Sequence, residues 1–275
     1  MTRIAVFQST TGIDPAANLG ALEQAIGKAA EGGAEMLFTP EMSGLLDKDS
    51  ARAAKNLREE AEDEVLAACR KAARKHRIWL HLGSLAVLVD NGKVANRGFV
   101  IDREGEIRAR YDKLHLFDVD LPTGESWRES NVYSAGSGVV LVSGTPLGKL
   151  GLTICYDLRF PGLFARLAEA DAEVIAVPAA FTVPTGKAHW HVLLRARAIE
   201  AGLFVVAAAQ VGRHEDGRQT FGHSLVVDPW GEILLDMVEE GGVGFAEIDL
   251  KRISDVRSRI PALNHRRPIP DAVTL

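Results

Sequence analysis

Short apolar runs typical of β-strands alternate with helical segments along the 275 residues, and this alternation restricts the possible folds most. Strand-like runs lie at 4–8, 150–154 and 203–209. Some neighbouring runs are separated only by tight-turn sequences, at 90–93 and 229–231. Tight turns join antiparallel strands, whereas helical crossovers join parallel ones. The sequence therefore predicts an α/β protein with mixed sheets, two of which pack face to face with helices outside.

Helix signals are clear in some segments and weak in others. Asp14 is a predicted N-cap and Pro15 the first residue of a helix, which continues at helical spacing to the glycines at 32–33. Residues 49–76 are predicted to be helical with one charged face. Residues 112–138 are polar and lack periodicity, so we expect an irregular loop that is either functional or mobile.

Composition restricts the partners. The net charge of −5 and the pI near 5.9 argue against nucleic-acid binding, which needs a clustered basic face. No apolar run approaches the roughly 18 residues that cross a membrane. The two cysteines lie far apart in the sequence and the first residues do not resemble a signal peptide, so a reducing, cytoplasmic setting is expected.

Three segments place a reactive side chain where a strand is predicted to run into a loop, namely Glu41, Lys113 and Cys155. A cysteine nucleophile needs a base, and a carboxylate in a dry pocket serves if its pKa is raised. An ammonium beside them stabilises a developing oxyanion, so the three suffice for acyl transfer. Each also has a structural interpretation, as a helix-terminal charge, a solvated lysine or a small buried hydrophobe.

These segments, in this order and spacing, resemble the Glu–Lys–Cys triad of the nitrilase (carbon–nitrogen hydrolase) superfamily. The resemblance covers nearly the whole chain. The matching segments are TPE (39–41), YDKLHLFD (111–118), RES (128–130), CYDLRFP (155–161), PAAFT (178–182), TGKAHW (185–190), LRARAIE (194–200), GHS (222–224) and VDPWG (227–231).

The resemblance implies a four-layer α-β-β-α sandwich, formed by one domain over residues 1–275. It implies that Cys155 is the nucleophile and that Glu41 is the general base and acid. Lys113 and the backbone N–H of Tyr156 would stabilise the oxyanion, and Glu129 would orient the lysine. The implied reaction needs no metal and no organic cofactor.

Within the superfamily the chain is similar to the Nit branch, and more to its deaminated glutathione amidases than to its omega-amidases. This implies hydrolysis of the terminal amide of a small carboxylate-bearing substrate through a cysteine thioester, with release of ammonia. Arg159 would grip the substrate carboxylate, unless it forms a salt bridge to Asp157. Phe181 and Thr182 match pocket-lining positions, although ordinary packing would also explain them.

Related sequences usually carry glutamate at position 191, where this chain has a histidine. His191 would therefore alter the charge of the pocket. His189 and His191 diverge in a helix and have no acidic or cysteine partner nearby in the sequence, so no metal site is predicted. Cys69 lies among apolar residues at helical spacing and is expected to be a packed thiol.

Other functions remain open. The same triad would serve an omega-amidase acting on 2-oxoglutaramate or an N-carbamoyl amino acid hydrolase, and nitrile hydrolysis is a weaker option. A catalytically silent scaffold is the alternative from another class. The resemblance also implies a homodimer or a higher oligomer, with residues from about 252 to 275 crossing the interface, and no nucleic-acid or membrane partner.

Overall fold

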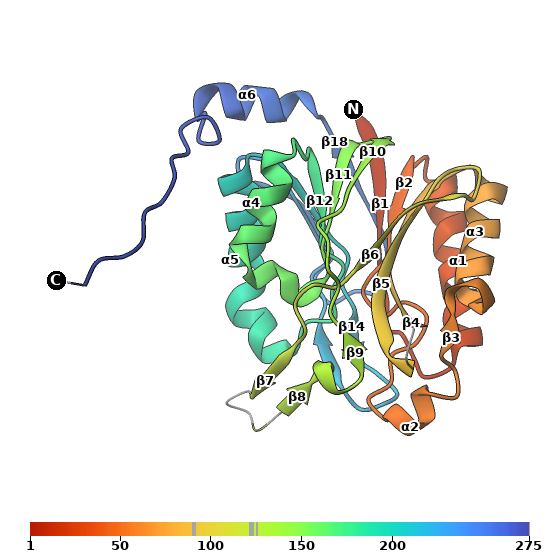
Figure 1. The fold of residues 1–275 in the computed structure, drawn as a ribbon. Coiled ribbons are helices and arrows are strands. Elements are labelled where there is room, and N and C mark those ends of the chain that lie inside the picture. Colours follow the sequence, from red (N-terminus) through yellow and green to blue (C-terminus); the bar gives the residue numbers. More distant parts are fainter. Residues whose placement is uncertain (90–91, 121–123, 125, 275) are drawn as a thin grey trace.

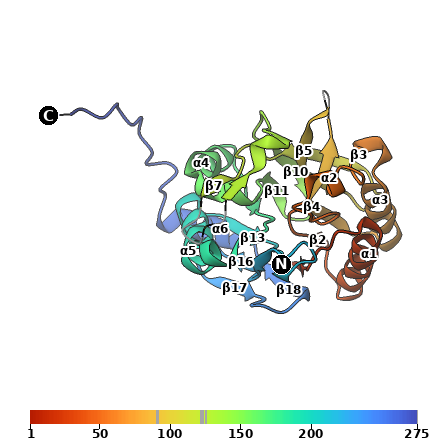
Figure 2. The ribbon, with the colours of Figure 1, turned by 90° about the horizontal axis from the view of Figure 1, so that it is seen from below.

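Two β-sheets pack face to face, and helices cover the outer side of each (Figure 1). The computed structural model describes residues 1–89, 92–120, 124 and 126–274. The view from below shows the same layers, with α1 and α3 on one side and α4 and α5 on the other (Figure 2). The predicted four-layer sandwich with mixed sheets is confirmed.

The first sheet contains the first and last strands of the fold side by side. Its order is β18 (Gly242–Ile248), β1 (Thr2–Gln8), β2 (Met36–Phe38), β4 (Trp79–Leu88), β5 (Val94–Ile101) and β6 (Ile107–Asp112), with β3 (Arg58–Glu59) beside β4 and β9 (Tyr133–Ser134) beside β5. The strands β1, β2 and β4 are parallel, and β5 and β6 follow as antiparallel neighbours. Because β4 pairs antiparallel with β5 and β5 pairs antiparallel with β6, the strand β6 runs in the same direction as β2.

The second sheet also combines a parallel centre with antiparallel edges. Its order is β10 (Leu141–Thr145), β11 (Gly148–Leu152), β12 (Val174–Ala176), β13 (Phe204–Ala207), β16 (Leu225–Val227) and β17 (Ile233–Asp236). Two hairpins lie outside both sheets, β7 (Asp118–Asp120) with β8 (Ser126–Arg128), and β14 (Val211–Arg213) with β15 (Gln219–Phe221). The predicted turn at 229–231 is confirmed, since β16 and β17 pair antiparallel around it.

The helices bury one face against the sheets. These helices are α1 (Pro15–Glu31), α3 (Glu64–His76), α4 (Pro161–Glu169) and α5 (Val183–Ala201), while α2 (Ser50–Ala53) and α6 (Lys251–Arg259) are shorter. Successive side chains of β1 point to opposite faces of the first sheet, so this strand contributes to two separate hydrophobic cores. Ile4 and Val6 face the second sheet, whereas Ala5 and Phe7 face the helices α1 and α3. Asp14 caps α1 as predicted, with its carboxylate accepting from the Ala16 amide.

The prediction of helix over residues 49–76 was wrong in its middle. The helix α2 ends at Ala53, and the chain then forms β3 and the 3-10 turn η1 (Glu60–Glu62) before α3 begins. Asp63 explains the restart, because its carboxylate accepts from the Leu66 amide at 2.8 Å and caps α3. The backbone of Arg58 meanwhile pairs with Val87 at the edge of β4.

The segment 112–138 is more ordered than its polar sequence indicated. It contains the β7–β8 hairpin, the 3-10 turn η3 (Glu129–Asn131) and β9. An ion pair braces the hairpin, in which Nη2 of Arg128 lies 2.9 and 2.8 Å from the two carboxylate oxygens of Asp120. Residues 121–123 and 125 lie outside the described residues, as do 90 and 91 of the turn predicted at 90–93.

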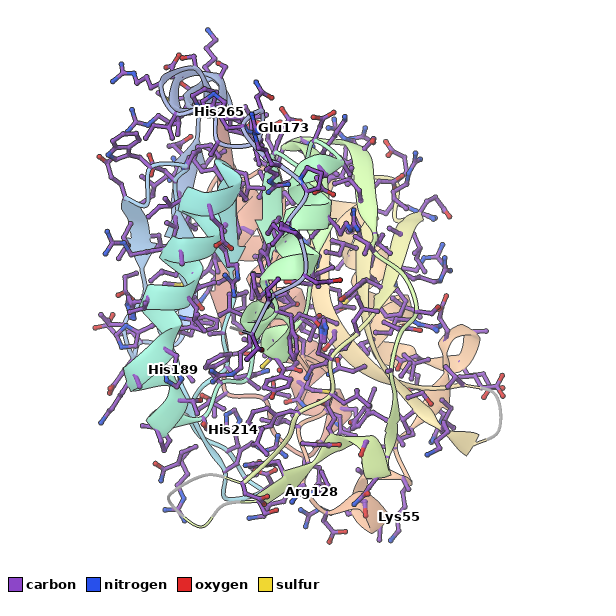
Figure 3. The ribbon with its side chains drawn as sticks, turned by 60° about the vertical axis from the view of Figure 1, so that its left-hand side comes forward. Lys55, Arg128, Glu173, His189, His214 and His265 are labelled. Carbon is purple, nitrogen blue, oxygen red and sulfur yellow. The ribbon has the colours of Figure 1, made fainter. Side chains whose placement is uncertain are left out.

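The hairpin β7–β8 and α2 lie at one end of the molecule, and α6 lies at the other (Figure 1). Figure 3 shows the same separation, with Arg128 at the hairpin end and His265 beyond α6. None of the helices in the described part of the chain is both long enough and apolar enough to span a membrane. The single domain, and a tail that crosses a dimer interface, stay predictions.

Gly83 allows β4 to approach the segment that precedes Glu41. A Cβ there would overlap the carbonyl oxygens of Thr39 and Pro40 and lie 2.6 Å from Cβ of Pro178. We expect Gly83→Ala to lower the free energy of unfolding by about 1–3 kcal/mol, measured by urea denaturation. Gly20→Ala in α1 is the matched control, because its Cβ meets open space; it should stabilise by about 0.5–1 kcal/mol. Equal stability of the two variants would contradict this account.

Candidate active site

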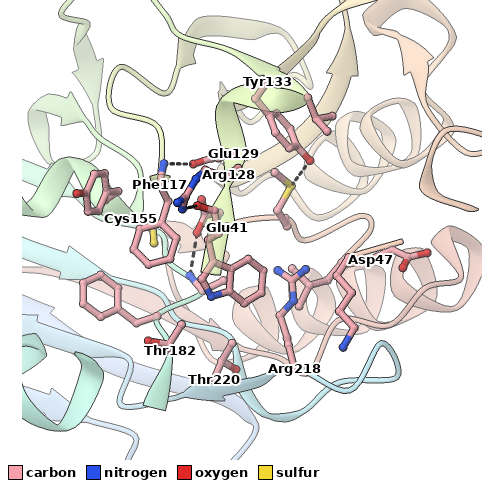
Figure 4. A pocket seen from close by; sticks show the side chains of 18 of the residues that line it. Glu41, Asp47, Phe117, Arg128, Glu129, Tyr133, Cys155, Thr182, Arg218 and Thr220 are labelled. Atoms are coloured by element: carbon pink, nitrogen blue, oxygen red, sulfur yellow. Dashed lines mark hydrogen bonds between the residues drawn. The ribbon is translucent and has the colours of Figure 1, made fainter. Parts of the chain in front are cut away.

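The three predicted catalytic side chains lie together at the hairpin end of the two sheets. Glu41 follows β2, Lys113 follows β6 and Cys155 follows β11. Strands that run in one direction end at the same edge, where α/β sheets commonly bind ligands. All three residues border one cavity, and Figure 4 shows Glu41 and Cys155 within it.

Lys113 is a buried ammonium held between two carboxylates, with 2% of its surface exposed. Its Nζ lies 2.9 Å from Oε1 of Glu41 and 2.9 Å from Oε2 of Glu129. Burial alone would lower the pKa of Lys113, but the charges of Glu129 and Glu41 outweigh it and raise that pKa well above the usual value. Lys113 is therefore charged near neutral pH.

Glu41 accepts hydrogen bonds on both carboxylate oxygens. Its Oε1 lies 2.9 Å from Nζ of Lys113 and 2.9 Å from Nδ2 of Asn96, and its Oε2 accepts from the Ala180 amide at 2.9 Å. Burial favours the neutral acid, but Lys113 and the hydrogen bonds from Cys155, Lys113 and Asn96 bring the pKa of Glu41 below its usual value. The raised pKa that the sequence analysis set as a condition for a carboxylate base is therefore not met here, since a dry pocket that contains an ammonium stabilises the carboxylate.

Cys155 opens the 3-10 turn η4 (Cys155–Arg159) in a left-handed conformation, with φ at +48°. Such a conformation is uncommon for a residue other than glycine and frequent at functional sites. Burial and the neighbouring charge of Glu41 raise the pKa of the Cys155 thiol well above its usual value, although Lys113 opposes this. The resting site therefore combines a thiol whose pKa is raised with a carboxylate whose pKa is lowered, which is the arrangement for proton transfer from Cys155 to Glu41.

The buried Asp157 joins the segment of Cys155 to the segment of Lys113. Its carboxylate accepts from the Tyr111 hydroxyl at 2.7 Å and from the His115 amide at 3.0 Å, and it lies 2.7 Å from Nδ1 of His115. Tyr111 and His115 flank Lys113 on both sides in the sequence. Asp157 thus fixes the position of the Cys155 segment relative to the Lys113 segment. Its partners are Tyr111 and His115, so the alternative of a salt bridge between Arg159 and Asp157 was wrong.

The cavity has a volume of about 1050 Å³. Every residue predicted for the site borders it, and so do several cations and an indole that the sequence analysis did not single out. The residues concerned are Glu41, Lys113, Glu129, Cys155, Tyr156, Arg159, Phe181 and Thr182 among those predicted, and Lys48, Trp127, Arg128 and Arg218 among those missed.

Arg159 lies over two aromatic rings at the wall of the cavity. Its guanidinium carbon is 5.9 Å from the ring centre of Tyr156 and 5.5 Å from that of Phe181. Its Nη1 lies 3.2 Å from Nδ1 of His189, which Figure 3 places on α5. Among the residues that the structure describes, no carboxylate lies within ion-pair distance of Arg159, so its charge is available to an anionic ligand.

Comparison with known proteins identifies the family. The model of the carbon–nitrogen hydrolase family, described as "Carbon-nitrogen hydrolase", matches residues 3–258. The chain belongs to the carbon–nitrogen hydrolase family. The nitrilase-like identification made from the sequence motifs is thereby confirmed.

Individual relatives of this carbon–nitrogen hydrolase agree in sequence and fold. Deaminated glutathione amidase of Yersinia enterocolitica is 38% identical over 273 residues, covering 98% of this chain and 94% of the relative. The crystal structure of the Caenorhabditis elegans NitFhit protein has a TM-score of 0.89 at 41% identity, and the match covers 97% of this chain but 65% of that one. Saccharomyces cerevisiae Nit3, described as a member of branch 10 of the nitrilase superfamily, has a TM-score of 0.86 at 27% identity over 97% and 96% of the two chains.

Asn96 is a site residue of this hydrolase that the sequence analysis missed. Its side chain, buried in β5, donates from Nδ2 to Oε1 of Glu41 and, at 3.2 Å, to Oε1 of Glu129. Its own Oδ1 is buried without a hydrogen-bond partner. An amide inside a mostly apolar strand was the one available signal, because burying an amide is unfavourable unless it is bonded.

His191 does not line the cavity, contrary to the expectation that it alters the charge of the pocket. Its Nε2 lies 2.9 Å from Oδ2 of Asp236, and His223 contacts the same carboxylate. The sequence argument against a metal site considered only neighbours in the chain, and therefore overlooked these two residues.

Replacing Glu41 should separate thiol reactivity from catalysis. The charge of Glu41 raises the pKa of Cys155, so Glu41→Gln lowers that pKa and increases the thiolate fraction near pH 7. We expect faster alkylation of Cys155 by iodoacetamide, followed by mass spectrometry, together with a fall in kcat/KM of about 10²–10⁴-fold because the base is lost.

Two internal controls accompany this experiment. Cys69 is fully buried in α3 as a packed thiol, as predicted, and burial raises its pKa to about 12, so it should stay unlabelled. Glu169→Gln removes a half-exposed carboxylate of α4 and should alter neither rate. Slower alkylation of Cys155 in Glu41→Gln would contradict the charge arrangement described above.

Proposed function

We propose that this chain is a cysteine amidase that hydrolyses small carboxylate-bearing amides, with deaminated glutathione as the favoured substrate. The observation that carries the proposal is that the thiol of Cys155, the carboxylate of Glu41 and the ammonium of Lys113 line one cavity, with the carboxylate 2.9 Å from the ammonium. The amidase activity is also supported by membership of the carbon–nitrogen hydrolase family, and the substrate by relatives named deaminated glutathione amidase.

The reaction follows from the residue types. Glu41 takes the thiol proton while the sulfur of Cys155 bonds to the amide carbon, and the oxyanion that forms is stabilised by Lys113 and the backbone N–H of Tyr156. Glu41 then gives its proton to the leaving amine as the C–N bond breaks, which leaves a thioester. Glu41 next removes a proton from water, which attacks the thioester, and the carboxylate product and the thiol are released.

The leaving amine depends on the substrate. The expected release of ammonia applies to a primary amide such as 2-oxoglutaramate. It was wrong for deaminated glutathione, because the nitrogen of its glutamyl side-chain amide belongs to cysteine, so hydrolysis releases cysteinylglycine. The cavity of about 1050 Å³ lies at the upper end of the range for small-molecule sites, about 300–1,000 Å³. This volume favours a tripeptide-sized substrate over 2-oxoglutaramate or a carbamoyl amino acid.

Recognition of the substrate is assigned to the wall of the cavity. Arg159 would bind a carboxylate of the substrate with two hydrogen bonds, while Phe181 and Thr182 line the space beside it. Glu129 would hold Lys113 in place rather than touch the substrate, since its carboxylate accepts from Lys113 and from the Phe117 amide at 2.6 Å.

We also propose a homodimer, in which α4 and α5 pack across a two-fold axis and the tail reaches over the partner. Val192 and Ile199 are exposed apolar side chains of α5 and support this placement. A cytoplasmic location stays a prediction.

The pH profile should show an acid limb at unusually low pH. Glu41 accepts the thiol proton only as a carboxylate, and its pKa lies below its usual value near 4.5. We therefore expect kcat/KM to stay constant from pH 7 down to about pH 5 and to fall only below that. Asn96→Ala removes a hydrogen bond to the charged form, so it should move the acid limb to higher pH. An unchanged or lower limb in Asn96→Ala would contradict the assigned role of Asn96.

Substrate choice is tested by steady-state rates on deaminated glutathione, 2-oxoglutaramate and an N-carbamoyl amino acid. We follow cysteinylglycine and ammonia separately, with Cys155→Ala as the inactive control. Deaminated glutathione should have the highest kcat/KM. Faster turnover of either other compound would overturn the substrate, and no turnover or acyl adduct at Cys155 with any of them would favour the silent scaffold.

Arg159→Gln tests whether Arg159 binds the carboxylate of the substrate. A hydrogen-bonded charge contributes about 1.5–3 kcal/mol, so KM for a carboxylate-bearing amide should rise about 10–150-fold, while KM for the neutral propionamide should change little. Arg166→Gln, an exposed arginine of α4, is the control. Equal effects of Arg159→Gln on both kinds of amide would refute carboxylate recognition.

A further inference from the structure

Three side chains with metal-binding chemistry meet outside the cavity, from three separate parts of the chain. His191 lies in α5, His223 just before β16 and Asp236 at the end of β17. One ligand atom from each lies within 4.8 Å of the other two. All three side chains are partly exposed, so an ion could reach them from solvent.

The distances among them are close to those of a metal site. Nε2 of His191 lies 2.9 Å from Oδ2 of Asp236, and Nδ1 of His223 lies 2.9 Å from Oδ1 of the same carboxylate. Zinc bonds of about 2.0–2.2 Å place neighbouring ligand atoms roughly 3–3.5 Å apart. Both contacts with Asp236 already approach this spacing, and a small rotation of the partly exposed His191 would complete the set.

Two of the three ligands are held in place by their surroundings. The His223 amide donates to the Val238 carbonyl at 2.7 Å, and the His223 carbonyl accepts from Nε1 of the fully buried Trp190 at 2.8 Å. Its ring stacks on Phe221 with centres 4.4 Å apart. Oδ1 of Asp236 accepts from the Val238 amide at 2.9 Å. Because these contacts already fix the side chains of His223 and Asp236, binding of an ion would cost little additional conformational entropy.

Charge also favours a cation here. Among the described residues, Asp236 forms no ion pair with a lysine or an arginine, and its contacts are with the two imidazoles. Two imidazole nitrogens and one carboxylate oxygen form a ligand set that suits first-row divalent ions.

We propose that His191, His223 and Asp236 bind one first-row divalent cation, such as Zn²⁺, with water at the remaining positions. The ion replaces the two N–H groups that now point at Asp236, and each neutral imidazole moves its proton to the other ring nitrogen. The site ties α5 to β17 and to the connection between β15 and β16. None of its ligands borders the cavity, so the site is independent of amide hydrolysis.

The test is titration of tag-free protein with Zn²⁺ by calorimetry. Cys155→Ala is used as the parent, because the active-site thiol would otherwise compete for the ion. We expect one ion per chain and a rise in Tm that EDTA reverses. His191→Gln and Asp236→Asn, each added to the parent, should weaken binding by about 10-fold or more. His189→Gln removes an imidazole from the same helix and should bind like the parent.

A second measurement does not depend on the variants. Diethylpyrocarbonate labelling followed by peptide mass spectrometry should show that Zn²⁺ protects His191 and His223 but not His189. Absence of binding, equal affinity in His191→Gln and the parent, or labelling of His191 that Zn²⁺ does not change would overturn the proposal. The three residues would then be a hydrogen-bonded clamp between α5 and β17.

Discussion

The buried ammonium of Lys113 is the constraint on which the active site depends. An ion with 2% of its surface exposed is tolerated only if counter-charges replace its water. Glu41 and Glu129 supply these charges, and Nδ2 of Asn96 bridges them by donating to both carboxylates. The position of each of the four side chains therefore depends on the other three.

The site also depends on the packing of the two sheets. Glu41, Asn96 and Lys113 come from the first sheet, whereas Cys155 comes from the second. Two of the polar links between the sheets lie at the site. The Ala180 amide donates to Glu41, and Asp157 accepts from the side chain and backbone of the segment that carries Lys113. A shift of one sheet against the other would leave buried polar groups unpaired on both sides, so these bonds favour a single register.

Local patterns predicted much of this structure, and contacts between distant residues account for the rest. The cap at Asp14 and the three reactive loop positions were readable because neighbouring residues determine them. The break in the helix predicted over 49–76 was not, because it arises from pairing of Arg58 with β4. The lowered pKa of Glu41 was also missed, since it results from a lysine 72 positions away. Asn96 drew no attention because its partners come from other elements.

The charge arrangement favours separate tasks for Lys113 and Arg159. Lys113 is already neutralised by two carboxylates, so it contributes little to attracting a substrate anion, whereas Arg159 has no carboxylate partner among the described residues. In the proposed reaction, Glu41 loses its negative charge when it takes the thiol proton, and a new negative charge forms on the substrate oxygen. Lys113 thus keeps two negative neighbours throughout the step. The surroundings need little reorganisation, which is the condition under which a fixed charge stabilises a transition state most effectively.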